Sequence, residues 1–332
     1  MSPAVAVVPG GSKPWPRVAT HRPLPGEMPE WRDWLRSQWV WPHGIYALTA
    51  ALRHEQRTDP HLPGPGDPSA AAKWEHYALG EAEMFYVAEP MCDLLLASAR
   101  GVPLDVMQSD LVPICSRGLV LFEKPWLGMA IEGTPIQVEA LLWGPTELPP
   151  ITPDDAPDAT IHALSVSTYV LDHSGEVGPV WCVLGRSDWP QRVAIGEEPW
   201  PMPEAVKQSY VEDRQVVAAL WTLLHQEGIA RISYPPRAET RRAERYAEKH
   251  GQSAESSRVR LVTLRDVEGH RSTRHADGGK EHDHRWPVSG HWRNQPYGPG
   301  RSLRRLQYID PYLKGPEGAP VKVPEVVKVW RR

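Results

Sequence analysis

The chain has 332 residues, of which 41 % are hydrophobic and 23 % charged, and its net charge is −4. This composition is typical of a globular protein with a sizeable core and excludes a fibrous or disordered chain. The 36 prolines exclude a simple helical bundle or a long coiled coil, because proline interrupts helices. The 15 tryptophans stand against only two phenylalanines, an imbalance that raises the question of whether some of them bind a ligand.

The charge is distributed unevenly along the chain. Residues 1–228 hold 15 Lys or Arg and 29 Asp or Glu, a net charge of −14, whereas residues 229–332 hold 22 and 12, a net charge of +10. Such asymmetry indicates a nucleic acid or another anionic partner for the basic part. The alternative is that the two parts neutralise each other by docking.

Cysteine spacing and hydropathy bear on the compartment. Cys92, Cys115 and Cys182 form no CxxC pair, so we expect reduced thiols in a cytoplasmic protein and no cysteine-based zinc site. No apolar run approaches the ~18 residues that span a membrane. The short apolar stretch near the N-terminus follows no basic segment, so no signal peptide and no membrane partner are predicted.

The N-terminal part is predicted to be helical. Residues 1–27 contain six prolines and little pattern, which favours a mobile arm. Residues 28–100 are expected to form an acidic helical lobe, with a long helix over 69–99 that is kinked at Pro90. A further helix is predicted over 44–57. The lobe is a candidate surface for a protein partner.

The middle and the C-terminal part are predicted to contain a sheet. Residues 101–228 are expected to form an antiparallel sheet of about four strands, packed against a helix over 203–227. Residues 229–332 are predicted to be a basic, β-rich region that includes a polar surface helix over 237–250. The fold class predicted is therefore α+β: a helical N-terminal lobe, an antiparallel sheet with a packed helix, and a basic β-rich tail.

The segment 282–315 combines basic and aromatic side chains and is the candidate binding site. Arginine and lysine neutralise phosphates, and aromatic rings stack on unstacked bases. In an extended strand, Arg285, His291 and Arg293 would share one face. The predicted nucleic-acid-binding residues are Arg285, Trp286, Trp292, Arg293, Tyr297, Arg301, Arg304, Arg305 and Lys314. Trp31, Trp34, Trp39, Trp74 and Trp221 stand instead at helical, core-like positions.

Other functions stay open. An RNA-cleaving, toxin-like nuclease would use His291 as an acid or base, Arg293 for charge stabilisation and Tyr308 as a third group. The tail could equally be a structural or protein-interaction element, with its aromatic residues in a small core. His270, His275, His282, Asp283, His284 and His291 could offer metal ligands, but H-x-H supplies only two, and no metal is predicted. No nucleotide-binding or hydrolase motif is present, and no cofactor is predicted.

The tail carries one resemblance. The sequence HRWPVSGHWRNQPYGPG, followed by LQYIDPYLKGPEGAP, resembles the ending of a widespread group of uncharacterised proteins from actinobacteria and their phages or plasmids. The helix VVAALWTLLHQ and the strand VRLVTLR fit that group as well. The resemblance covers roughly residues 115–320 and implies a cytoplasmic protein, encoded on a mobile element. It implies no activity, cofactor or catalytic residue.

Overall fold

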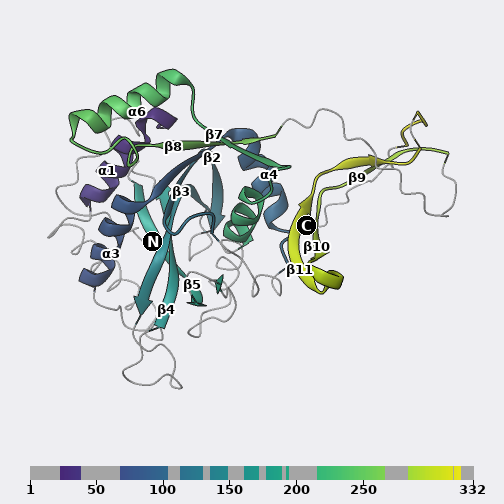
Figure 1. The fold of residues 1–332 in the computed structure, drawn as a ribbon, viewed down its shortest axis with the longest axis horizontal. Coiled ribbons are helices and arrows are strands. Elements are labelled where there is room, and N and C mark those ends of the chain that lie inside the picture. Colours follow the sequence, from purple (N-terminus) through teal and green to yellow (C-terminus); the bar gives the residue numbers. More distant parts are fainter. Residues whose placement is uncertain are drawn as a thin grey trace. The chain divides into compact units, whose positions relative to one another are not determined.

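The computed structural model divides the chain into two compact units, Met1–Leu264 and Arg265–Arg332, which are described separately (Figure 1). The residues that the structure describes are 23–38, 68–103, 113–129, 135–148, 161–171, 177–188, 192–193, 215–265, 283–316 and 318–322. The predicted helix over 44–57 lies outside these residues. The predicted domain boundaries at 27, 100 and 228 stay predictions.

The first unit is built on an eight-stranded sheet with the order β6-β5-β4-β3-β2-β1-β8-β7. The strands are β1 (Glu83–Val87), β2 (Gly118–Met129), β3 (Pro135–Leu148), β4 (Ile161–Leu171), β5 (Val177–Asp188), β6 (Arg192–Val193), β7 (Ala230–Ser233) and β8 (Val259–Leu264). Strands β2 to β5 pair antiparallel, as predicted. The short strands β7 and β8, predicted as part of the tail, belong to this same sheet.

Helices cover this sheet. They are the 3-10 turn η1 (Pro25–Glu27), α1 (Met28–Gln38), α3 (Pro68–Glu81), α4 (Glu89–Ala99), a helix over residues 215–224, and α6 (Arg237–Lys249). The α+β class is therefore confirmed. The predicted helix over 203–227 is confirmed for residues 215–224, whereas residues 203–214 lie outside the described part of the chain. Among the described residues, no helix is long and apolar enough to cross a membrane.

Strand β1 corrects the prediction of one long helix over 69–99. Residues 83–87 form a strand that pairs parallel with both β2 and β8 near the middle of the sheet. Met84, Phe85 and Val87 are fully or almost fully buried, because helices cover both faces of the strand. A strand buried on both faces has no alternating polar pattern, and its apolar run therefore resembles the stripe of a helix. Pro90 lies in the first turn of α4, where proline is tolerated.

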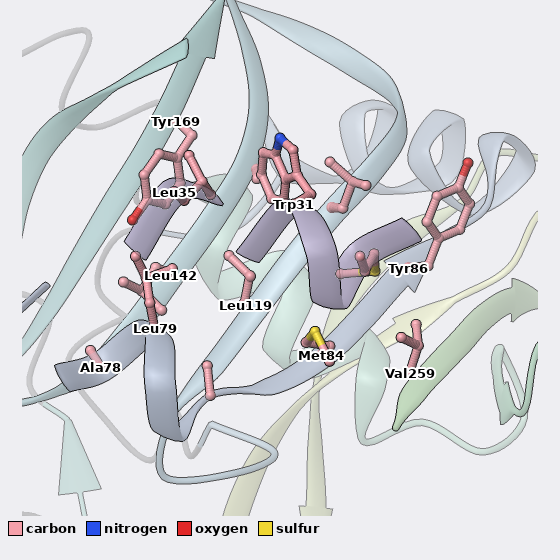
Figure 2. Close-up of a cluster of buried hydrophobic side chains, with 14 residues drawn as sticks. Trp31, Leu35, Ala78, Leu79, Met84, Tyr86, Leu119, Leu142, Tyr169 and Val259 are labelled. Carbon is pink, nitrogen blue, oxygen red and sulfur yellow. The ribbon is translucent and has the colours of Figure 1, made fainter. Parts of the chain in front are cut away.

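One face of the sheet packs against α1 and α3 (Figure 2). Trp31 and Leu35 of α1 and Leu79 of α3 are at most 2 % exposed and lie on apolar side chains of β1 to β4. The Trp31 ring meets the edge of Tyr169 with ring centres 6.3 Å apart. Trp74 donates a hydrogen bond from Nε1 to the Pro145 carbonyl at 2.8 Å, so it too has a structural role.

The opposite face carries a second aromatic core. Trp143 of β3 stacks on Phe85 at 6.2 Å and meets Trp221 edge-on at 5.9 Å. Trp221 lies in the helix over 215–224 and is fully buried, as the helical pattern predicted. Gly118 of β2 lies directly opposite Trp143, and a side chain at this position would overlap the indole ring. The buried tryptophans thus fill the core rather than bind a ligand.

The end of the predicted mobile arm is packed against the first unit. Pro25, Gly26 and Glu27 are buried, and Glu27 forms an ion pair with Arg242 of α6 at 2.5 Å. The Gly26 amide donates to the Glu239 carboxylate at 2.9 Å. Residues 25–27 are therefore held in place by Glu239 and Arg242 of α6. These partners are distant in sequence, so the composition of residues 1–27 does not reveal them. The earlier residues of the arm, 1–22, lie outside the described part of the chain.

Candidate nucleic-acid interface

The described residues of the second unit form two short antiparallel pairs of strands. Strand β10 (His291–Tyr297) pairs with β11 (Leu303–Ile309), and β9 (Trp286–Val288) pairs with β12 (Tyr312–Lys314). The β10–β11 turn contains the 3-10 turn η3 (Pro299–Arg301), flanked by Gly298 with φ +75°. The Ser302 hydroxyl donates to the Pro299 carbonyl at 3.0 Å and closes this turn. Residues 291–309 are called the cationic hairpin below.

The strand predicted over 285–292 is interrupted at Ser289 and Gly290. A side chain at Gly290 would overlap the Tyr308 hydroxyl, so this close approach requires glycine. Because the strand is interrupted at Ser289 and Gly290, Arg285 does not belong to β10. Its amide donates to the Pro320 carbonyl at 2.8 Å and its carbonyl accepts from the Lys322 amide at 2.7 Å. The structure therefore does not place Arg285 in one row with His291 and Arg293.

The pairing register assigns the side chains of the cationic hairpin to two faces, since directly opposed residues share a face. Arg293 lies opposite Gln307, Gln295 opposite Arg305, and Tyr297 opposite Leu303. The arginine–glutamine face thus consists of His291, Arg293, Gln295, Tyr297, Leu303, Arg305, Gln307 and Ile309. The tryptophan face consists of Trp292, Asn294, Pro296, Arg304, Leu306 and Tyr308.

The cationic hairpin is strongly positive. It contains four arginines, Arg293, Arg301, Arg304 and Arg305, and no Asp or Glu. All four side chains are exposed. Among the described residues none of the four forms an ion pair. Arg304 folds back at the turn, where its Nη1 donates to the carbonyl of Arg301 at 2.6 Å. The hairpin therefore presents positive charge to solvent.

The predicted stacking residues already have neighbours within the second unit. Trp292 meets Tyr308 edge-on at 5.1 Å, and Tyr308 is only 6 % exposed. Burial, with a contribution from Asp310, raises the pKa of the Tyr308 hydroxyl. The Arg305 guanidinium lies 5.6 Å from the centre of the Tyr297 ring, and the Lys314 ammonium lies 6.0 Å from that of Trp286. Cations thus lie over two of the rings predicted to stack on bases.

The residues of the alternative nuclease site are not all brought together. His291 and Arg293 share the arginine–glutamine face, where the His291 ring contacts the Ser289 carbonyl at 3.0 Å. Tyr308 belongs to the opposite face, where it is buried and its ring contacts that of Trp292. Strand alternation separates them, because His291 and Arg293 are two positions apart whereas Tyr308 pairs with the residue between them.

Metal ligands are not grouped in the described part of the chain, where no cluster of three or more His, Cys, Asp or Glu could hold an ion. His284 is paired with its neighbour Asp283 at 2.5 Å, and this hydrogen bond lowers the pKa of the Asp283 carboxyl. His270, His275 and His282 lie outside the described residues.

The structure adds Gln295 and Gln307 to the candidate site. Each stands directly opposite an arginine on the same face of the hairpin. Neither stands out in the sequence, because neutral amides carry no charge signal. Their pairing could have been found by counting outward from the glycine-rich turn at 298–300, which sets the register of the two strands.

Comparison with known families gives one match. Residues 216–315 match the AcrVA2-like family, described as the anti-CRISPR type V subtype A2 family. The matched span is under a third of the chain and contains β7, α6, β8 and the whole cationic hairpin. Among curated proteins, none matches the chain.

Proposed function

We propose that this chain binds nucleic acid through the cationic hairpin and thereby interferes with a type V CRISPR complex. The observation that carries the proposal is a surface of four exposed arginines, without a single carboxylate in residues 291–309, inside a span similar to an anti-CRISPR family. CRISPR effectors hold a guide RNA and a target DNA, so a polyanion is accessible in such a complex. The resemblance of the tail to phage and plasmid proteins supports the same role.

The physical basis is the release of counterions from phosphates. Each arginine that contacts a phosphate displaces condensed cations, so binding weakens as salt rises. Arg301 lies in the turn of the hairpin, Arg293 lies on β10, and Arg304 and Arg305 lie on β11. A duplex contacted by all four would lose affinity with a logarithmic salt slope of roughly −0.9 per phosphate, or about −3 to −4 in total.

Fluorescence anisotropy of labelled 20-nucleotide probes, single-stranded and duplex, tests this at 50 and 200 mM salt. We expect binding at low salt and at least a tenfold loss at high salt. The double variant Arg301→Ala/Arg304→Ala should bind more weakly, with a shallower salt slope. Arg245→Ala, which removes an exposed arginine from α6, is the matched control and should leave binding unchanged. Absence of binding at 50 mM salt, or affinity indifferent to salt, would refute the nucleic-acid proposal.

Interference is measured separately, as cleavage of a target plasmid by a type V effector with its guide RNA. We expect the chain to reduce cleavage and the double arginine variant to do so less. The acidic lobe over residues 28–100 is assigned the contact with the protein component of the complex, because its negative charge does not suit contact with the nucleic acid. Undiminished cleavage at saturating concentrations of the chain would contradict the anti-CRISPR role while leaving nucleic-acid binding intact.

The nuclease alternative gains only partial support, from the shared face of His291 and Arg293. RNA cleavage by the chain that is lost in His291→Ala, with the fold preserved, would favour it. Cleavage that survives this change would refute the catalytic role of His291.

A further inference from the structure

We infer that the arginine–glutamine face of the cationic hairpin binds double-stranded DNA in its major groove. This rests on the proposed function and names the nucleic acid that the hairpin recognises. The observation behind it is the side-by-side placement of two arginines and two glutamines on one face of a two-stranded ribbon.

The side chains on this face match the edges of base pairs. Arginine reads guanine through two hydrogen bonds to O6 and N7, and glutamine reads adenine through N6 and N7. Arg293 faces Gln307 and Arg305 faces Gln295, so each reader of guanine lies beside a reader of adenine. Along each strand, alternate residues stand about 7 Å apart, close to the rise of two base pairs. Four adjacent base-reading groups thus occupy the centre of the face.

The dimensions of the hairpin fit the groove. Its two strands lie about 4.8 Å apart and each extends for roughly 20 Å. The major groove of B-form DNA is about 12 Å wide and admits a two-stranded β-ribbon. Tyr297 and Leu303, which are 38 % and 48 % exposed, continue the face toward the turn. Leu303 supplies apolar contact of the kind that the thymine methyl group accepts.

The same geometry disfavours other nucleic acids. Single strands are bound chiefly by stacking on aromatic faces, but a cation lies over Tyr297 and Trp292 packs on Tyr308. Duplex RNA has a deep and narrow major groove that side chains do not read. No Asp or Glu interrupts the hairpin, so its approach to the negatively charged groove is attractive along its whole length.

The inference is tested with four labelled 20-mers of one sequence: duplex DNA, duplex RNA, single-stranded DNA and single-stranded RNA. At 100 mM salt we expect duplex DNA to bind at least tenfold tighter than each of the others. Equal or tighter binding of an RNA or single-stranded probe would overturn the inference and leave the proposed function standing. Absence of binding to every probe, also at 50 mM salt, would overturn both.

Base reading is tested by selecting bound sequences from a randomised duplex pool. Gln295→Ala/Gln307→Ala removes no charge, so we expect an unchanged salt slope but a loss of adenine preference at the selected positions. Gln295→Met/Gln307→Met keeps the length of the side chains and should give the same result if the alanine pair fails to fold. Arg304→Ala, on the tryptophan face, is the control and should weaken all sequences alike. Unchanged selected sequences in the glutamine variants would overturn the inference.

Discussion

Replacing Glu75 by glutamine should remove a pH-dependent loss of stability from the first unit. Glu75 of α3 is fully buried, and its carboxylate accepts hydrogen bonds from the Ser167 hydroxyl at 3.0 Å and from the Tyr169 hydroxyl. Within the described residues no ion pair involves Glu75. Burial therefore outweighs the two hydrogen bonds and raises its pKa from 4.5 to about 7.

The direction of the effect follows from this raised pKa. Below pH 4.5 Glu75 is protonated in both the folded and the unfolded chain, and its contribution to stability is fully present. As the pH rises from 4.5 through about 7, the unfolded chain releases its proton first, and the folded state loses stability. At 1.36 kcal/mol for each pH unit between the two values, the loss above pH 7 is about 3 kcal/mol.

Urea unfolding followed by far-UV circular dichroism at pH 5 and pH 8 measures this change. Glutamine keeps an acceptor for Tyr169 but has no charge to bury. The free energy of unfolding of the wild type, relative to Glu75→Gln, should therefore fall by about 2–3 kcal/mol between pH 5 and pH 8, because a small part of the loss has already occurred at pH 5. Glu248→Gln, at an exposed position of α6, is the matched control and should change with pH as the wild type does. If Glu75→Gln also follows the wild type at both pH values, the argument from burial is refuted.

Two further predictions concern the core of the first unit. Gly118→Ala should lower the free energy of unfolding by about 1–3 kcal/mol, because the added methyl group meets the Trp143 ring. Gly228→Ala is the control and should change the free energy of unfolding little, because the space around Gly228 is open. Equal stabilities of the two variants in thermal or urea unfolding would contradict the close approach of Gly118 to Trp143. Burial raises the pKa of Cys92 to about 11 and that of Cys115 to about 12, so at pH 8 we expect both thiols to react with iodoacetamide far more slowly in the folded chain than in 6 M guanidinium, as measured by peptide mass mapping. Labelling of either thiol at the rate of the unfolded chain would show that the thiolate is accessible.

The helices and antiparallel strands with clear periodicity could be predicted from local pattern. Apolar residues recur at helical spacing over 216–224, and the polar Gln137 and Glu139 alternate with apolar residues over 136–142, although the structure buries residues 216–224 and 138–142 on all sides. Strand β1 escaped prediction because it is covered on both faces, and its partners β2 and β8 are distant in sequence. Pairing between such distant segments is decided by the packed sheet rather than by local preference.

For the candidate site, too, some features could be predicted from the sequence and others could not. The composition of residues 282–315 is sufficient to reveal the concentration of positive charge and aromatic residues. The close approach of Gly290 to the Tyr308 hydroxyl has no such local signal, because Tyr308 lies eighteen residues further along the chain. The break at Ser289 and Gly290, which separates Arg285 from β10, is likewise absent from the local pattern.

Composition and local periodicity were enough to predict the α+β class, the positive charge of the C-terminal part and the core positions of Trp31 and Trp221. Which side chains share a face depends instead on tertiary pairing. The antiparallel register of β10 and β11 places Arg293 beside Gln307 and directs Tyr308 to the opposite face. A register is a property of two paired strands, so it cannot be read from either strand alone. The protonation of Glu75 likewise depends on the folded chain, since burial by elements from distant parts of the sequence raises its pKa.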